Sequence, residues 1–311
     1  MSTLSSLARR LSRGLPSSAA PPAVEECLAT GTLLLEQAGI ETARLDVECL
    51  LGEVLAWPRW RVPLEPRHRL TAAEFAAFLR LLERREGREP LAYLLGRREF
   101  WSLPLRVAPG VLIPRPETET LVEAALAAVR AEGDLAPTIV ELCTGSGAVA
   151  IALATELPDA RLLATDLSWQ ALRLARANAE GCGVGVRIRF ARGNLWRALT
   201  GIVQPGSVDL ALANPPYIAS ALLPDLMPEV QWEPRRALDG GPDGLDLVRE
   251  ILAGAPRWLR PGGRLLLEIG SGQAQATGRL VGAQAELEPA GVVRDLAGWE
   301  RVVVVRRRPV D

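Results

Sequence analysis

The second part of this 311-residue chain alternates short apolar runs with helical patterns, and this alternation limits the fold more than any other feature. After a helix at 121–131, we expect strands at 139–142, 161–165, 186–190, 208–213 and 264–268, with final strands at 291–295 and 301–305. Strands separated by helices predict a doubly wound α/β sheet with mostly parallel strands. Such sheets bind ligands beyond the carboxyl ends of their strands.

The first part of the chain has a different pattern. Residues 23–90 predict a small helical bundle, which we expect to dock a substrate, with a plain scaffold as the alternative. Pro58 is expected to end its second helix, and Thr71 with Glu74 forms a capping-box pattern that opens the next one. Residues 91–120 predict an extended junction or hairpin whose strand-like pieces are broken at Pro104. Residues 121–311 are expected to form the α/β domain.

Residues 1–22 contain six serines, three arginines and no acidic residue. A flexible tail and an organellar transit peptide share this composition, and we favour the tail. The four cysteines form no CxxC pair, which is typical of a reducing compartment, and no apolar run is long enough to span a membrane. We therefore expect a cytoplasmic protein, or an organellar matrix protein if residues 1–22 are a transit peptide.

The scarce residue types exclude several mechanisms. All 36 basic residues are arginine, and His68 is the single histidine. A chain without lysine has neither a Schiff-base lysine nor a P-loop lysine, and one histidine cannot form an HExxH zinc motif. We expect no metal site, and a reaction that depends on backbone groups, amides, carboxylates or a bound cofactor.

A glycine-rich loop, residues 143–147, follows the first strand expected in the α/β domain and leads directly into a helix. Its glycines allow a tight turn and close approach to a ligand, and the helix N-terminus offers unpaired amides. The next strand ends at Asp166, 21 residues after Gly145. This spacing is close to the ~20 residues typical of an acid that binds ribose hydroxyls. The combination predicts a nucleoside-binding site.

The fourth strand expected in the α/β domain runs into Asn214-Pro215-Pro216-Tyr217. Two prolines remove backbone donors and fix the chain direction, and the asparagine adds a side-chain carbonyl. We expect Asn214 Oδ1 and the Pro215 carbonyl each to accept one hydrogen of a planar NH2 group. An ordinary Asn-Pro turn is the alternative, but its position at the carboxyl end of a strand, near the glycine loop, favours a site.

Together these motifs resemble class I S-adenosylmethionine (AdoMet) methyltransferases that modify amide or amine nitrogen. Segments 98–101, 112–119, 233–235 and 240–246 narrow the resemblance to the protein-(glutamine) methyltransferases of peptide-chain release factors, the PrmC/HemK type. Segments 43–46 and 300–304 match as well, so the resemblance covers about residues 25–308. It implies a Rossmann-like, mostly parallel sheet whose last strand is antiparallel, with a small N-terminal all-α domain.

The resemblance also implies roles for individual residues. The methionine part of AdoMet would lie against Cys143, Thr144, Gly145, Ser146 and Gly147, its ribose on Asp166, and its adenine near Asn194 and Leu195, with Asn214 also close to the cofactor. The catalytic and substrate-binding group would be Asn214, Pro215, Pro216 and Tyr217, with Phe100 as a wall of the target pocket. The family more often has glycine at 143, aspartate at 194 and, in some members, an aromatic residue at 195.

The implied substrate is the glutamine of the Gly-Gly-Gln motif in class I release factors, methylated on its side-chain nitrogen. A sister enzyme with the same Cys-Thr-Gly-Ser-Gly sequence methylates a ribosomal-protein glutamine, and Asn-Pro-Pro-Tyr can also hold the exocyclic amine of adenine. The net charge of −1 counts against stable nucleic-acid binding. Two further functions are alternatives. A nicotinamide oxidoreductase would fit the glycine loop but would leave the role of Pro215-Pro216 unexplained, and a non-catalytic binding module would not need Asn214. We expect a monomer that binds the release factor and no membrane.

Overall fold

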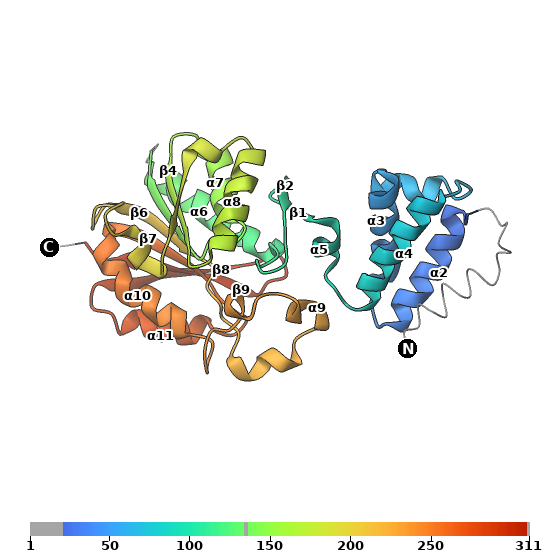
Figure 1. Cartoon of the computed structure of the whole chain (residues 1–311). Helices are drawn as coiled ribbons and strands as arrows, with labels where there is room; N and C mark the ends of the chain where they lie inside the picture. Colours follow the sequence, from blue (N-terminus) through green and yellow to red (C-terminus); the bar gives the residue numbers. More distant parts are fainter. Residues whose placement is uncertain (1–20, 134–135, 310–311) are drawn as a thin grey trace. The chain divides into compact units, whose positions relative to one another are not determined.

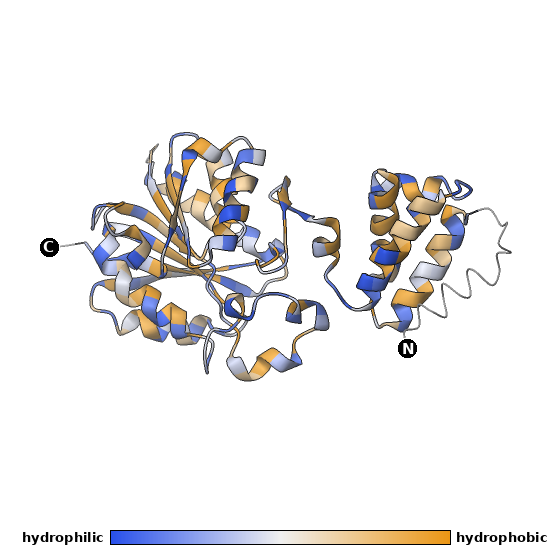
Figure 2. Cartoon of the chain, viewed as in Figure 1, coloured by the Kyte–Doolittle hydropathy of each residue, from blue (hydrophilic) through white to orange (hydrophobic). Residues whose placement is uncertain are grey.

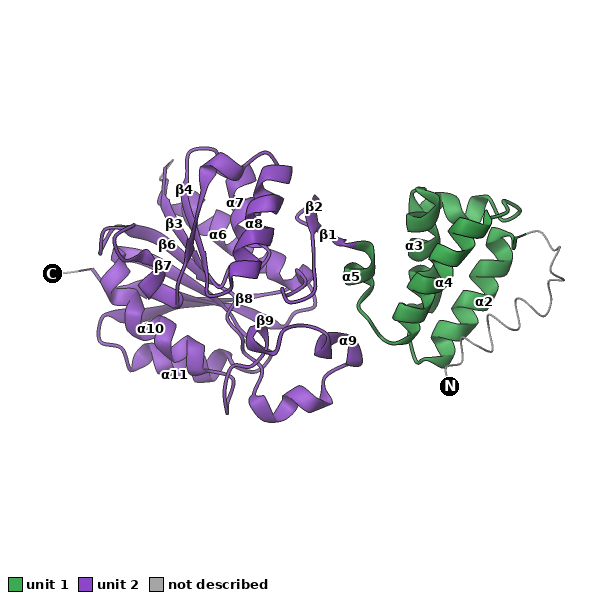
Figure 3. Ribbon diagram, viewed as in Figure 1, with its two compact units in different colours: residues 1–95 green, residues 96–311 purple. Residues whose placement is uncertain are grey.

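The computed structural model describes residues 21–133 and 136–309. The chain divides into two compact units, residues 1–95 and 96–311 (Figure 3). The flexible tail expected at 1–22 falls outside the described residues except for its last two positions. No helix in the described ranges is both long and apolar enough to cross a membrane.

The N-terminal unit is helical, as predicted. Its elements are α2 (Val24–Gln37), α3 (Ala43–Leu55), the 3-10 helix η1 (Arg59–Leu64), α4 (Ala72–Glu86) and α5 (Leu91–Leu95). The capping box of α4 is confirmed: the Thr71 hydroxyl accepts from the Glu74 amide, and the Glu74 carboxylate accepts from the Thr71 amide. Helix α3 ends at Leu55, before Pro58, because Ala56 adopts a left-handed conformation with φ of 53°.

The second unit contains a seven-stranded sheet in the described residues (Figure 1). Its strands are β3 (Thr138–Leu142), β4 (Arg161–Asp166), β5 (Ile188–Arg192), β6 (Val208–Ala213), β7 (Leu259–Glu268), β8 (Leu287–Arg294) and β9 (Glu300–Arg307), in the order β5-β4-β3-β6-β7-β9-β8. Strands β3 to β7 pair in parallel, and β9 is antiparallel to both of its neighbours. The predicted sheet with an antiparallel last strand is confirmed.

Helices cover both faces of this sheet. The elements are α6 (Glu119–Glu132), α7 (Ala148–Glu156), α8 (Trp169–Gly181), α10 (Asp246–Trp258) and α11 (Ala274–Gly282). Along β3, Ile139 packs into one apolar core with α6 and α7, and the next residue, Val140, packs into a second core with α10 and α11. Figure 2 shows the apolar residues concentrated along the central strands. Both faces of the central parallel strands β3 and β6 are buried, as is typical of parallel sheets.

A hairpin precedes the sheet, formed by β1 (Arg97–Phe100) and β2 (Leu103–Arg106). The expectation that Pro104 breaks the strand is wrong, because Pro104 lies within β2, opposite Glu99. A two-stranded hairpin tolerates proline, since each strand has an unpaired edge where the missing N–H costs nothing. The side chain of Asn178 on α8 holds the hairpin, accepting from the Arg106 amide at 2.8 Å and donating to the Arg106 carbonyl at 3.0 Å.

Candidate active site

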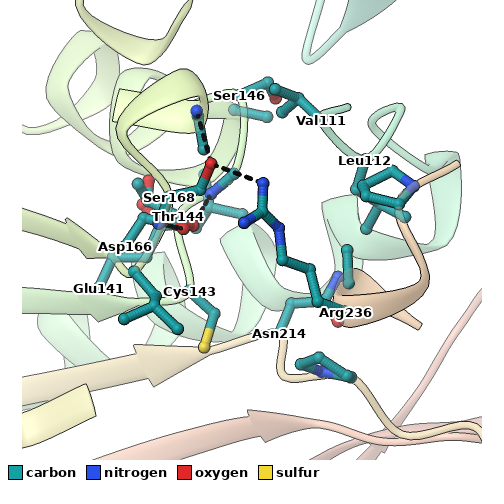
Figure 4. A pocket seen from close by; sticks show the side chains of 18 of the residues that line it. Val111, Leu112, Glu141, Cys143, Thr144, Ser146, Asp166, Ser168, Asn214 and Arg236 are labelled. Carbon is teal, nitrogen blue, oxygen red and sulfur yellow. Dashed lines mark hydrogen bonds between the residues drawn. The ribbon is translucent and has the colours of Figure 1, made fainter. Parts of the chain in front are cut away.

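A pocket lies at the carboxyl ends of β3, β4 and β6, where the sheet topology predicts a ligand (Figure 4). The predicted residues that line it are Phe100, Cys143, Thr144, Gly145, Ser146, Asp166, Asn194, Leu195, Asn214 and Pro216. Gly147, Pro215 and Tyr217 belong to the same loops but do not line the pocket. The structure therefore gathers in one cavity side chains that are up to 116 positions apart in the chain, from Phe100 to Pro216.

The glycine loop turns sharply between β3 and α7. Gly145 and Gly147 have φ of 57° and 84°, in the left-handed region that favours glycine. A Cβ atom on Gly147 would lie 2.9 Å from the Cβ of Ala175 on α8, whereas a Cβ on Gly145 would meet nothing within 4 Å. Glycine is therefore needed at position 147 for two reasons, the left-handed backbone conformation and the close packing against α8. At position 145 it is needed only for the backbone conformation.

Alanine substitutions at 145 and 147 separate the effect of backbone conformation from the effect of packing. We expect Gly145→Ala to lower the free energy of unfolding by about 1 kcal/mol, the cost of a left-handed non-glycine residue. Gly147→Ala adds overpacking against α8, so we expect a loss of about 2–4 kcal/mol. Urea denaturation of the two variants without ligand measures the difference, and equal losses would contradict the packing argument.

Asp166 at the end of β4 fixes the glycine loop. Its Oδ2 accepts from the Gly145 amide at 2.9 Å, and its Oδ1 accepts from the Ser168 amide at 2.7 Å. Each carboxylate oxygen keeps a second lone pair that can accept a ligand hydroxyl. Arg236 reaches across the pocket to donate to Ser168 Oγ at 3.2 Å (Figure 4). Arg236 is not among the residues predicted from the sequence; it lies directly after the segment 233–235 that carried the resemblance.

Glu141 lies beneath the glycine loop and is 3% exposed. Its carboxylate accepts from the Thr144 hydroxyl and from the Ala150 amide. Burial raises the pKa of Glu141 to about 8, although these two donors favour the charged form, and the nearby charge of Asp166 adds a smaller increase. The side chain therefore connects the glycine loop to the first turn of α7, and its raised pKa means that it binds a proton more tightly than an exposed glutamate does.

The raised pKa of Glu141 makes stability depend on pH. Its folded pKa of about 8 lies above the ordinary 4.5, so the native state binds more protons than the unfolded state between these values. We expect the free energy of unfolding to be highest near the acidic end of this window and to fall by a few kcal/mol as pH rises through it. Glu141→Gln should flatten the curve obtained by denaturant titration, whereas the same change at exposed Glu123 should not. Identical slopes for wild type and Glu141→Gln would contradict the prediction.

The Asn214–Tyr217 loop follows β6 at the pocket edge. Asn214 Nδ2 donates to Thr118 Oγ1 at 3.2 Å, which leaves Oδ1 as the free acceptor of this amide. Gln273 donates to the Tyr217 carbonyl at 2.9 Å, and a Cβ on Gly244 would lie 2.3 Å from that carbonyl oxygen. Only glycine allows the 240–244 segment to approach the loop this closely.

The Tyr217 side chain does not line the pocket, although the sequence resemblance places Tyr217 in the substrate-binding group. Its ring lies against Gly270, where an added Cβ would be 3.1 Å from Tyr217 Cδ2, and it is not part of the pocket lining. Burial raises the pKa of Tyr217 to about 12. The phenol is therefore neutral and packs beneath the loop.

Glu233 joins two segments that carried the sequence resemblance. Its Oε2 accepts from the Ile113 amide at 2.9 Å, and its Oε1 forms an ion pair with Arg115. The Glu233 side chain is 1% exposed, so this pairing satisfies a buried carboxylate. It holds segment 112–119 beside segment 233–235, and both contribute residues to the pocket wall.

The site has what a nucleoside cofactor requires: a glycine turn at a helix N-terminus, and a carboxylate at the end of the next strand. In the described parts of the chain, no group of three or more His, Cys, Asp or Glu side chains could hold a metal ion. The fold and the site define an AdoMet-dependent methyltransferase of the Rossmann-like class.

Comparisons with known proteins specify the family. Residues 26–96 match the PrmC N-terminal domain and residues 139–231 a methyltransferase domain. A release factor glutamine methyltransferase from Moorella thermoacetica is 42% identical over 285 residues, which cover 92% of this chain and 99% of that one. One from Cereibacter sphaeroides is 43% identical over 273 residues, which cover 88% of this chain and 94% of that one. Another, from Bradyrhizobium diazoefficiens, is 40% identical over 288 residues, covering 92% of this chain and 95% of that one. The chain belongs to the release factor glutamine methyltransferase family.

Proposed function

We propose that the chain transfers a methyl group from AdoMet to the side-chain amide nitrogen of the glutamine in the Gly-Gly-Gln motif of class I release factors. The observation that carries this proposal is the orientation of Asn214, whose Nδ2 is bonded to Thr118 and whose Oδ1 is the free acceptor. A primary amide nitrogen offers two hydrogens: Asn214 Oδ1 would accept one at the pocket lining, and the carbonyl of Pro215, the next residue of the same loop but outside that lining, would accept the other.

AdoMet would bind in the part of the pocket formed by the glycine loop, Asp166 and residues 194–195, which we call the cofactor half. Cys143 to Gly147 would bind its methionine part through backbone groups, Asp166 its ribose, and Asn194 with Leu195 its adenine. Leu195 is buried, and Asn194 lies directly before it in the pocket wall. When bound, AdoMet supplies a methyl group that its sulfonium charge activates toward a nitrogen nucleophile.

The work of the protein is then chiefly orientation. An amide nitrogen is a poor nucleophile, because its lone pair is delocalised into the carbonyl. Asn214 and Pro215 would hold the nitrogen in line with the methyl group, and orientation of this kind lowers a barrier by ~7–11 kcal/mol. Their hydrogen bonds would also favour a pyramidal, more nucleophilic nitrogen. As the N–C bond forms, the methyl–sulfur bond would break and leave its electron pair on a neutral thioether sulfur. The nitrogen would then be cationic and would lose a proton to water without a side-chain base.

A radiolabelled methyl-transfer assay tests the proposal with several substrates side by side. Purified release factor should accept one methyl group, and release factor with its Gly-Gly-Gln glutamine changed to alanine should accept none. Ribosomal proteins and DNA serve as the competing substrates. If the radiolabel appeared in ribosomal protein or DNA and not in the release factor, the proposed substrate would be wrong and the labelled molecule would take its place.

We infer further that the enzyme is a cytoplasmic monomer whose helical unit docks the release factor. None of the four cysteines, all of which lie within the described ranges, forms a disulfide, which suits a reducing compartment. A net charge of −1 gives no general attraction to nucleic acid. Light scattering on the purified chain tests whether it is a monomer. Surface mutations in residues 23–90 test the docking role: they should abolish methylation of a release-factor domain but not of a short Gly-Gly-Gln peptide.

A further inference from the structure

Three side chains from separate elements meet beside the Asn-Pro-Pro-Tyr loop. Asn214 follows β6, Glu268 is the last residue of β7, and Thr118 ends the 3-10 helix η2 (Pro116–Thr118). Asn214 and Glu268 are neighbours because Ala213 pairs with Leu267 across β6 and β7. Thr118 and Glu268 are buried, with 5% and 1% of their surfaces exposed.

The hydrogen bonds among these three side chains have a fixed direction. Asn214 Nδ2 donates to Thr118 Oγ1 at 3.2 Å, and the Thr118 side chain lies close enough to the Glu268 carboxylate to lower the pKa of Glu268 by hydrogen bonding. A hydroxyl carries a single hydrogen, and a carboxylate only accepts. Because the Thr118 oxygen accepts from Asn214, its single hydrogen is the one available to the Glu268 carboxylate.

Core packing alone does not explain Glu268. Its second oxygen, Oε2, is buried without a hydrogen-bond partner among the residues that the structure describes. Burial raises the pKa of Glu268 to about 7; the Thr118 bond and the charges of Arg301 and Arg115 lower it, and Glu117 raises it. A buried carboxylate with an unsatisfied oxygen costs free energy that an apolar side chain would avoid.

We propose that Thr118 and Glu268 are positioning residues that hold the Asn214 amide with Oδ1 toward the pocket and Nδ2 away from it. The two orientations of an asparagine amide have nearly the same shape, so packing cannot choose between them, whereas a hydroxyl anchored to a carboxylate can. This inference rests on the proposed function, because a glutamine NH2 group brings only hydrogens to Asn214. A reversed Asn214 would present its own hydrogens to that group and leave it unpaired.

Valine and serine at position 118 test the role of the hydroxyl. Thr118→Val keeps the shape and removes the hydroxyl, and Thr118→Ser keeps the hydroxyl. We expect Thr118→Val to lower kcat/KM for the release factor about 100-fold, as for loss of one preorganised hydrogen bond at a reacting group. AdoMet affinity, measured by calorimetry, should stay within about twofold, and Thr118→Ser should keep kcat/KM within about threefold of wild type.

Glu268→Gln is a second variant in case valine disturbs folding. Its amide can either accept from Thr118 or donate to it, so the fixed direction is lost, and we expect an intermediate fall of about tenfold in kcat/KM at unchanged AdoMet affinity. Wild-type activity in Thr118→Val and Glu268→Gln would overturn the proposal. A Thr118→Ser variant as impaired as Thr118→Val, or losses confined to AdoMet affinity, would overturn it as well.

A measurement without substrate keeps this inference separate from the proposed function. The side-chain NH2 signal of Asn214 can be assigned in ¹⁵N NMR spectra by its absence from Asn214→Ala. Its hydrogens should exchange slowly with water in wild type and Thr118→Ser, and faster in Thr118→Val. Equal exchange in wild type and Thr118→Val would refute the positioning role. If wild type shows the predicted exchange but methylates no release factor, only the proposed function fails.

Discussion

Asn214→Ala is expected to lower kcat for release-factor methylation by about 10³-fold or more, while AdoMet binds with nearly unchanged affinity. The variant removes the free acceptor Oδ1 at the pocket edge and leaves only the Pro215 carbonyl to orient the substrate nitrogen. A nitrogen held by one bond rotates out of line with the methyl group, so the loss falls on the transition state. The cofactor half of the pocket, from the glycine loop to Asp166, is untouched.

The measurement pairs single-turnover methyl transfer with calorimetric titration of AdoMet. Asn194→Ala is a matched control, because it is the same change at another lining residue of the same pocket, the one proposed to lie near the adenine. We expect this control to weaken AdoMet binding and to leave the rate at saturating cofactor largely intact. If Asn214→Ala instead lost AdoMet affinity as its main defect, Asn214 would be assigned to the cofactor.

The sequence predicts those parts of the structure that depend on local chemistry. The Thr71–Glu74 capping box spans three positions, and the glycine loop and Asp166 belong to one strand–helix–strand unit. Strand β7 shows where local patterns fail: the strand begins at Leu259, whereas the pattern predicts a start at 264. Residues 261–263, Pro-Gly-Gly, are typical of a turn in the sequence, but in the structure they continue the strand through an irregular pairing with β6. Strand β5 likewise begins at Ile188, since Gly185–Arg187 forms a 3-10 helix.

The parts that the sequence does not predict are partnerships between distant residues. Glu233 lies 118 positions from Arg115, and Asn178 lies 72 positions from Arg106, so neither pairing leaves a local pattern. The role proposed for Glu268 leaves no local pattern either, because Thr118, whose side chain lowers the pKa of Glu268, and Asn214 belong to other elements of the chain. Such contacts follow from the strand order, which only the folded chain determines.

Asp166→Ala is expected to raise the Kd for AdoMet about 100-fold or more, because hydrogen bonds from ribose hydroxyls to a charged acceptor contribute ~1.5–3 kcal/mol each. At saturating AdoMet the rate should recover most of its wild-type value. Exposed Asp159→Ala, the same change between α7 and β4, should leave the Kd unchanged.

Asp166 also holds the Gly145 amide, so a weakened Kd could arise from a displaced loop instead of lost ribose contacts. An AdoMet analogue without the ribose 2′-hydroxyl separates the two causes in a double-mutant cycle. If Asp166 binds that hydroxyl, its removal weakens binding to wild type and has little further effect on Asp166→Ala. Equal losses with both proteins would show that the two changes act independently, and Asp166 would then serve the cofactor only by fixing the glycine loop.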